Sequence, residues 1–259
     1  MEAIRVENLS VSYEDNRVIS DMSLAIPQGK VSIIVGGNGC GKSTLLKTVA
    51  RILKPESGNI FIAGSDVKDQ KARDVARQMA FLPQTPQCPE TITVRELVTY
   101  GRFPYQNALG GHSIHDREQV QWALEETGLT DLAERMVESL SGGQRQRAWI
   151  AMTLAQETGI ILLDEPTTYL DMAHQLEVLQ LLQKLNREKG YTIVMVLHEL
   201  NLACRFADHM IGMKAGKVIC QGAPHEAITE QTLREIYGID ATLQQSREGY
   251  PVCVGFERC

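Results

Sequence analysis

The sequence has few aromatic residues, no CxxC cysteine pair and no long apolar run. Each of these shortages limits the fold classes and binding sites that the chain can form. Only 5% of the 259 residues are aromatic, so the core must consist mainly of aliphatic side chains, which suits a buried parallel sheet. The six cysteines are scattered without a CxxC pair, which indicates free thiols rather than a zinc site or a disulfide framework. The longest apolar runs, such as IVMVL at 193–197, are far shorter than the ~20 residues of a membrane-spanning helix.

An excess of basic charge is also missing. The chain has 26 Lys and Arg residues against 32 Asp and Glu residues, which gives a formal net charge of −6. Binding to a nucleic-acid backbone usually needs a basic surface, so we expect no nucleic-acid partner. The N-terminal residues carry charges throughout and lack the apolar stretch of a secretory signal, so we expect a protein that stays in the cytoplasm.

Strand and helix patterns alternate along most of the chain. Residues 3–27 predict two short strands with polar outward positions, and residues 30–36, 59–64 and 79–83 predict further strands separated by helices. Repeated alternation of this kind predicts an α/β fold with a mainly parallel sheet. The stretch GGNGCGKST at 36–44, which follows the strand at 30–36, matches a P-loop, so we expect a P-loop NTPase core with an N-terminal antiparallel β-subdomain.

The pattern changes between Gln84 and Leu140. Prolines flank and interrupt this segment, and its only periodic pieces, ITVRELVTYG and DREQVQWALEETG, are helical. We interpret residues 85–155 as an inserted α-helical subdomain of a single domain that covers residues 1–241. Residues 242–259 then form a C-terminal extension without an assigned role, whose charges and glycines are typical of a solvated segment.

The stretch GGNGCGKST at 36–44 matches the pattern of a P-loop. Its glycines allow consecutive backbone N–H groups to curl around a polyphosphate, and the helix that follows adds the positive end of its dipole. Lys42 supplies an ammonium group for the β- and γ-phosphate oxygens, and the Ser43 hydroxyl suits Mg²⁺. We assign the whole stretch to a nucleotide site: Gly36, Gly37, Asn38, Gly39, Cys40, Gly41, Lys42, Ser43 and Thr44.

Two other buried strands end in residues that suit phosphate chemistry. IILLDEP at 160–166 ends in Asp164, which can hold a magnesium shell, and Glu165, which can orient or deprotonate a water that attacks the γ-phosphate. TIVMVLH ends in His198, which can donate a hydrogen bond to a γ-phosphate oxygen. The remaining five histidines are expected in surface or loop positions. The carboxyl ends of parallel strands meet at one sheet edge, so we expect these side chains to serve one site.

A second anion-binding helix start occurs at LSGGQ, residues 140–144. Ser141 can cap a helix, the backbone N–H groups of Gly142 and Gly143 can approach an oxyanion closely, and a good helix-forming composition begins at Gln144. The chain thus carries two phosphate-binding features.

These motifs, in this order, resemble those of the nucleotide-binding subunit of ABC transporters over about residues 1–241. The resemblance implies that Tyr13 stacks on adenine, that Gln84 contacts Mg²⁺ and the attacking water, and that Asp171 lies at a subunit interface. It also implies a head-to-tail homodimer that binds ATP and Mg²⁺. In that dimer Ser141, Gly142, Gly143 and Gln144 of one copy cover the nucleotide of the other.

The lack of fused membrane spans resembles the organisation of importers. In these systems two integral-membrane permease subunits dock on the helical subdomain at the cytoplasmic face of the cell membrane, and an extracytoplasmic substrate-binding protein delivers the cargo. ETITVRELVTYGRFPYQ and DEPTTYLDMAHQLEVLQLL are similar to ATPases of iron-siderophore uptake and to their relatives for haem and cobalamin. The cargo never touches this subunit, so its identity stays open at this point.

Two alternatives belong to other classes. A soluble ABC ATPase of the iron–sulphur assembly type fits the chain length but not the GRFPYQ and TTYLD stretches. A regulatory module without turnover is disfavoured because Lys42, Asp164, Glu165 and His198 are all present. Gly37 stands where relatives usually carry proline, which leaves every ligand-bearing position intact.

Overall fold

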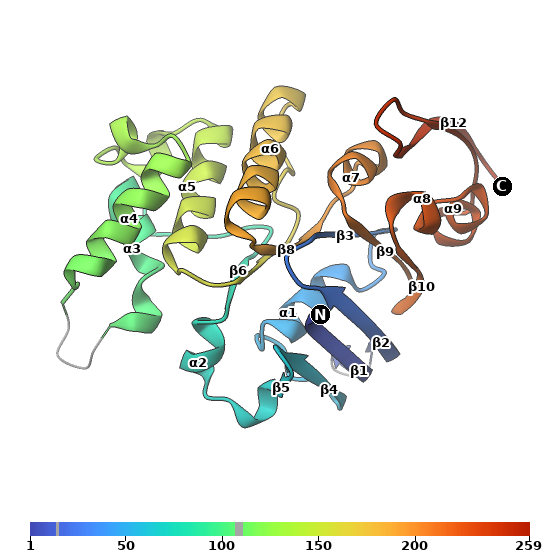
Figure 1. The fold of residues 1–259 in the computed structure, drawn as a ribbon, viewed down its shortest axis with the longest axis horizontal. Coiled ribbons are helices and arrows are strands. Elements are labelled where there is room, and N and C mark those ends of the chain that lie inside the picture. The colour runs from blue at the N-terminus through green and yellow to red at the C-terminus, as the bar shows by residue number, and fades with distance from the viewer. Residues whose placement is uncertain (14–15, 107–110) are drawn as a thin grey trace. The chain divides into compact units, whose positions relative to one another are not determined.

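The computed structural model describes residues 1–13, 16–106 and 111–259. The chain forms two compact units, Met1–Gln70 with Leu185–Cys259, and Lys71–Lys184 (Figure 1). The second unit contains the predicted helical insertion together with the elements that flank it. None of the helices in the described ranges combines the length and the apolar character of a bilayer-crossing segment.

The first unit contains an antiparallel sheet with the strand order β2-β1-β4-β5. Its strands are β1 (Glu2–Tyr13), β2 (Asn16–Pro27), β4 (Ser57–Ile62) and β5 (Ser65–Asp66). Ile4 pairs with Ile26 on one side and with Ile62 on the other, and all three side chains are buried. The predicted antiparallel subdomain is confirmed, but the assignment of residues 59–64 to the parallel alternation was wrong. β4 pairs with β1 because its apolar positions match those of β1 across the ladder.

The mainly parallel strands of this unit are β3 (Val31–Gly36), β8 (Thr192–Val196) and β9 (His209–Lys214), and β10 (Lys217–Gly222) returns antiparallel to β9. β3 pairs in parallel with both β8 and β9. Every residue of β3 and β8 is buried, as expected for parallel strands covered on both faces. The helices α1 (Lys42–Val49) and α7 (Leu200–Phe206) follow β3 and β8 in the chain.

The C-terminal part of the first unit is ordered, although its sequence shows little pattern. α8 (Pro224–Ala227) and α9 (Glu230–Tyr237) precede a hairpin of β11 (Ile239–Gln245) and β12 (Pro251–Arg258). The Asn201 side chain in α7 accepts a hydrogen bond from the Cys253 backbone N–H at 2.8 Å and donates one to the Cys253 carbonyl at 3.1 Å. The segment interpreted as a solvated extension is therefore a folded hairpin, although most β12 side chains are exposed.

The second unit contains two parallel strands, β6 (Met79–Leu82) and β7 (Ile160–Leu163). Its helices are α2 (Ala72–Ala76), α3 (Val94–Tyr100), α4 (Ile114–Glu126), α5 (Gly142–Ala155) and α6 (Met172–Lys189), of which α6 ends beyond Lys184. Short 3₁₀ turns lie at Phe103–Tyr105, Thr130–Leu132 and Val137–Ser139. α3, α4 and α5 each begin with a capping box, at Thr93, Ser113 and Ser141, which explains why the helices start there.

Candidate functional site

The predicted P-loop connects β3 to α1 in the first unit. Gly36, Gly39 and Gly41 have φ angles of 151°, 73° and 103°, which L residues with side chains rarely adopt. Gly41 is the N-cap of α1, and the helix begins at Lys42. The glycines thus permit the tight curl that brings the loop backbone to the positive end of the helix dipole.

Lys42 lies within this loop with only 5% of its surface exposed. Its Nζ donates to the carbonyl oxygens of Gly36 at 2.9 Å and Gly37 at 3.0 Å. A buried ammonium group needs such partners, and the oxygens of a polyphosphate would provide stronger, charge-assisted ones. Ser43 is half-buried and Thr44 is buried in the first turn of α1.

The register of the sheet relates His198 to the P-loop. Ile34 in β3 pairs with Val196 in β8, so Gly36 and His198 each lie two residues further along neighbouring parallel strands. His198 is exposed and follows the strand rather than ending it. Tyr13 ends β1 with 44% of its surface exposed, which leaves the ring available for stacking.

Gln84, Asp164 and Glu165 lie in the second unit, where β6 and β7 end. Leu82 pairs with Leu163, and the Asp164 backbone N–H donates to the Leu82 carbonyl at 2.9 Å. Gln84 Nε2 donates to Glu165 Oε2 at 2.6 Å, which joins residues from two sequence motifs. Asp164 is 2% exposed whereas Glu165 is half-buried, so the two carboxylates occupy different environments as the pleat predicted.

Glu165 has a second partner that the sequence did not reveal. Thr168 Oγ1 donates to the same Oε2 atom of Glu165 at 3.0 Å. The Glu165 backbone has φ 55°, a left-handed conformation that costs a non-glycine residue about 1–3 kcal/mol. Two hydrogen bonds and a strained backbone thus fix the orientation of this carboxylate.

The LSGGQ stretch forms the start of α5, as predicted. Gln144 N–H donates to Ser141 Oγ at 3.3 Å, and the Ser141 N–H donates to Gln144 Oε1 at 3.1 Å. Ser141 and Gly142 are exposed, so this helix start faces outward. A side chain at Gly143 would lie 2.3 Å from the His174 ring, so only glycine fits there.

His174 also contacts the predicted interface acid. Asp171 Oδ1 accepts from the His174 backbone N–H at 2.9 Å and lies 2.8 Å from its Nδ1. These hydrogen bonds, that of the backbone first, hold the pKa of Asp171 below its usual value. His174 therefore links Asp171 to Gly143 within one chain, a contact that no sequence motif indicated.

The structure thus gathers the predicted residues into two sets. The first unit contains Tyr13, the P-loop and His198, and the second contains Gln84, Asp164, Glu165, LSGGQ and Asp171. In the second set a hydrogen bond joins Gln84 to Glu165, which lie far apart in the sequence. In the first set the register of β3 and β8 relates His198 to the P-loop.

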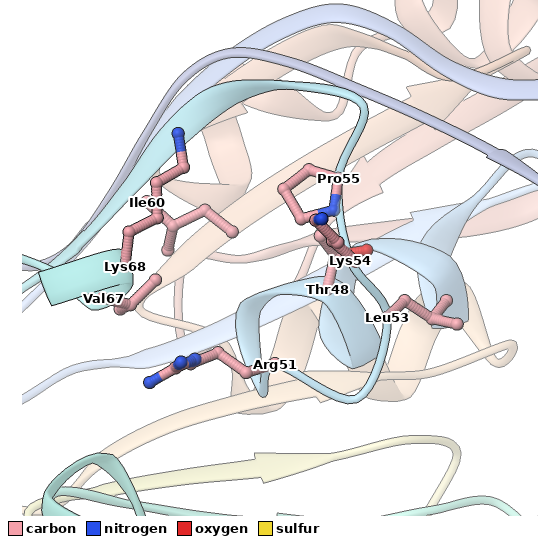
Figure 2. Close-up of a pocket in the computed structure, with 8 residues that line it drawn as sticks. All are labelled: Thr48, Arg51, Leu53, Lys54, Pro55, Ile60, Val67 and Lys68. Carbon is pink, nitrogen blue, oxygen red and sulfur yellow. The ribbon is translucent and has the colours of Figure 1, made fainter. Parts of the chain in front are cut away.

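Two other features lie outside the prediction. His209 was expected in a surface or loop position, but it begins β9 with a partly buried ring, and this burial lowers its pKa. A cavity of about 380 Å³ in the first unit (Figure 2) contains none of the predicted site residues. It is lined by Thr48, Arg51, Leu53, Lys54, Pro55, Ile60, Val67 and Lys68.

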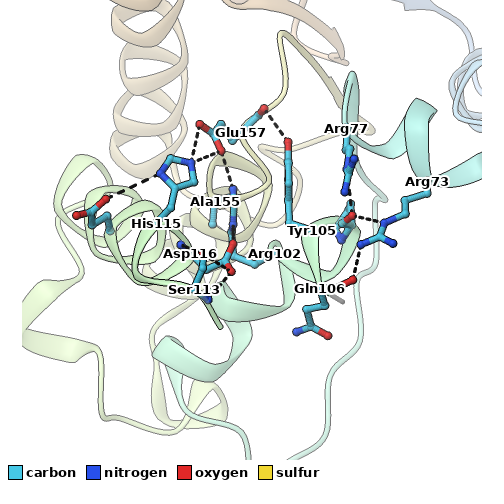
Figure 3. Close-up of polar contacts among 12 residues, drawn as sticks. Arg73, Arg77, Arg102, Tyr105, Gln106, Ser113, His115, Asp116, Ala155 and Glu157 are labelled. Atoms are coloured by element: carbon cyan, nitrogen blue, oxygen red, sulfur yellow. Dashed lines mark hydrogen bonds and ion pairs between the residues drawn. The ribbon is translucent and has the colours of Figure 1, made fainter. Parts of the chain in front are cut away.

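A buried arginine organises the helical part of the second unit (Figure 3). Arg102 is 1% exposed, and its guanidinium donates to Asp116 at 2.7 Å, to the Ala155 carbonyl at 2.8 Å and to Glu157 at 3.0 Å. The same group stacks on the Tyr105 ring, 4.0 Å from its centroid. Arg102 therefore ties the GRFPYQ stretch to α4 and to the end of α5.

Replacing Arg102 by methionine should destabilise the protein by about 3–5 kcal/mol, because Asp116 would keep a buried, unpaired charge. Urea unfolding measures the change. Arg95 is a matched control, since it also donates to a carboxylate, that of Glu134, at 2.7 Å but lies at the surface. Arg95→Met should cost no more than about 1 kcal/mol. Equal losses in both variants would contradict the role given to burial.

The same pair predicts a pH dependence. Burial raises the pKa of Asp116, but hydrogen bonds from Arg102 and Ser113 outweigh it and lower the pKa to about 2. A carboxyl with a depressed pKa stabilises the fold above its unfolded pKa of about 4, and this stability is lost as the pH falls toward 2. We expect a loss of about 2 kcal/mol over that range. In Asp116→Asn the free energy of unfolding in urea should no longer fall in this way between about pH 4 and pH 2. A pH dependence equal to that of the parent protein would refute the role given to Asp116.

Comparisons with known proteins show the family to which the chain is similar. A model of the family described as ABC transporter matches residues 19–168. The iron(3+)-hydroxamate import ATP-binding protein FhuC of Bacillus subtilis (strain 168) is 49% identical over 99% of this chain and 96% of its own length. A solved ABC transporter in an inward-facing conformation aligns with a TM-score of 0.84 at 30% identity over 98% of both chains. A bacterial ABC transporter cassette described as dimeric aligns with a TM-score of 0.74 at 31% identity over 85% of this chain and 98% of its own.

Proposed function

Because this chain belongs to the family of ABC transporter ATP-binding subunits and is therefore an ATPase, we propose that it energises an importer of iron–siderophore complexes. The cargo class follows from the similarity to an iron(3+)-hydroxamate import protein along nearly the whole chain. The GRFPYQ and TTYLD stretches, which favoured siderophore uptake, lie within that similarity.

The single observation that carries the hydrolytic part is the 2.6 Å hydrogen bond between Gln84 and Glu165. This bond and that from Thr168 hold the Glu165 carboxylate in one orientation, as a group that accepts a proton from an attacking water must be held. Lys42 and the start of α1 bind the phosphates, Tyr13 stacks on adenine, and His198 donates to the γ-phosphate. Each residue thus orients one part of the substrate.

The residues assigned to Mg²⁺ fit a hard cation. The Ser43 hydroxyl, the Gln84 amide and the Asp164 carboxylate offer oxygen ligands, which Mg²⁺ prefers. When bound, the ion would neutralise charge on the β- and γ-phosphates. Asp164 is almost fully buried, and a carboxylate in such surroundings attracts a cation more strongly than it does in water.

The exposed helix start at Ser141 and Gly142 supports a head-to-tail homodimer. Its backbone N–H groups face outward and carry the positive end of the α5 dipole. In the proposed dimer this surface covers the γ-phosphate bound by the partner copy, and Asp171 lies at the interface. Hydrolysis and phosphate release remove the negative charge that holds the copies together. The two copies then separate, and this motion drives the conformational change of the permease.

The helical subdomain is the proposed docking site for two permease subunits. Tyr100 and Phe103 are 55% and 75% exposed, and Arg102 between them is anchored by the buried network of Figure 3. Exposed aromatic side chains on a rigid support are typical of an interface. Docking there holds the subunit at the cytoplasmic face of the membrane. An extracytoplasmic substrate-binding protein delivers the cargo to the permease.

Co-expression with a candidate pair of integral-membrane permease subunits tests this function. We expect the chain to co-purify with the permease in detergent, its ATPase rate to rise in the complex, and vesicles containing the complex to accumulate a ferric hydroxamate when ATP is supplied. Cobalamin and haem are the comparison cargoes. A soluble scaffold as the stable partner, without stimulation by any permease, would overturn the transport role.

A further inference from the structure

The hairpin between β9 and β10 contacts the P-loop, although neither its sequence nor the proposed mechanism gives it a role. Ala215 and Gly216 form its two-residue turn, with φ angles of 46° and 74°. Left-handed values at both positions are typical of a type I′ turn, which prefers glycine. The Gly216 N–H donates to the Cys40 carbonyl in the middle of the P-loop at 3.0 Å.

Gly216 is also held on its other side. Its carbonyl accepts from the Ser20 N–H in β2 at 3.4 Å. A side chain at Gly216 would lie 2.1 Å from the Val18 carbonyl oxygen, so the turn approaches β2 too closely for any other residue. The Gly216 residue therefore connects β2, which is part of a sheet, to the P-loop backbone.

The hydrogen bond fixes the orientation of one P-loop peptide group. A trans peptide is planar, with its C=O and N–H on opposite sides. Since the Cys40 carbonyl points outward to Gly216, the N–H of Gly41 in the same peptide points the opposite way, toward the inside of the loop. Inward-pointing N–H groups are what a phosphate-binding nest requires. The Cys40 side chain is buried, which restricts this peptide further.

We propose that Gly216 is a positioning residue for the nucleotide: its N–H holds the Cys40–Gly41 peptide in the orientation that binds phosphate. This inference rests on the proposed function of the P-loop. It adds that the conformation of the loop is fixed from outside by the β9–β10 turn, and that nucleotide affinity depends on this contact.

Gly216→Ala tests the proposal, because the added methyl group must push the turn away from β2 and the P-loop. We expect the Kd for MgADP and the KM for ATP to rise about threefold to tenfold, the effect of one lost hydrogen bond, with kcat within about twofold. Gly190→Ala is the matched control. It has φ 72° and no atom within 4 Å of an added Cβ, so it introduces the same backbone strain without displacing the turn.

If both variants lose stability equally and bind MgADP like the parent protein, the role of Gly216 is only structural and the proposal fails. Lys42→Ala distinguishes a failure of the P-loop assignment from a failure of the positioning role of Gly216. If Lys42→Ala also binds MgADP normally, the P-loop assignment itself fails. A loss of binding in Lys42→Ala with none in Gly216→Ala overturns only the positioning role.

Amide exchange in the unmodified protein provides a second measurement if Gly216→Ala does not fold. Coupling is reciprocal, so a contact that favours nucleotide binding must itself be strengthened by nucleotide. We expect MgADP to slow the exchange of the Gly216 amide by about threefold to tenfold, the same coupling factor. The Gly249 amide at the β11–β12 turn should be unaffected. An unchanged Gly216 rate under saturating MgADP would refute the proposal.

Discussion

Glu165→Gln is expected to lower ATP hydrolysis by about 10²–10⁴-fold, the usual contribution of a general base, while ATP binding stays intact. Glutamine has nearly the same shape and keeps an oxygen that can accept from Gln84 and Thr168, so the local structure should persist. What is lost is the negative charge that accepts a proton from water. Single-turnover hydrolysis measures this step directly.

The same variant should also accumulate a dimer with ATP, because the bound γ-phosphate that holds the two copies together is no longer removed. Size-exclusion chromatography with MgATP and with MgADP distinguishes the two states. Glu134→Gln is a suitable control, since Glu134 is a surface residue that pairs with Arg95, away from the residues assigned to the nucleotide. Turnover at the parent rate in Glu165→Gln would remove Glu165 from its proposed role.

Lys42→Ala should act on binding rather than on the chemical step alone. Hydrogen bonds to charged groups contribute about 1.5–3 kcal/mol each, so we expect MgATP affinity to fall by about 10–150-fold. Lys42 is 5% exposed, and its ammonium group donates to the loop carbonyls of Gly36 and Gly37. It can exchange these neutral partners for phosphate oxygens. Equilibrium titration with a fluorescent ATP analogue measures the loss.

Lys54→Ala serves as the control for Lys42→Ala, because Lys54 is exposed and lies beyond the end of α1. It should bind nucleotide like the parent protein. Parent-like affinity in Lys42→Ala would remove Lys42 from its proposed role. An equal loss in both variants would show that general charge rather than a P-loop lysine governs binding.

Local motifs allowed much of the site to be predicted. The P-loop and LSGGQ depend on glycines and capping residues next to one another in the chain, so their backbone form follows from sequence order. The strands before Gly36 and Asp164 are continuous apolar runs, as fully buried parallel strands usually are.

What the sequence did not reveal depends on contacts between distant segments. The sequence of β4 does not show the direction of its neighbours, and its pairing with β1 and β5 makes it part of the antiparallel sheet. The β11–β12 hairpin has few buried side chains, so its alternation is weak. Side chains of other elements anchor it, including Asn201 in α7 and Arg234 in α9. Long-range pairing of this kind overrides local preference.

The side chains that position the site were missed for the same reason. Thr168 and His174 contribute contacts to Glu165 and Asp171. Both lie in the DEPTTYLDMAHQLEVLQLL stretch, but the sequence of that stretch does not indicate these contacts. Arg102 lies within the GRFPYQ stretch, yet nothing in its neighbours indicates that it is fully buried. Such residues are identified only when the fold places their partners beside them.

The structure of the Glu165→Gln variant crystallised with MgATP tests the central claim most directly. Two copies should be found, each ATP contacting the lysine-bearing loop of one copy and the Ser141–Gly143 helix start of the other. A single copy whose own LSGGQ stretch covers its nucleotide would contradict the account.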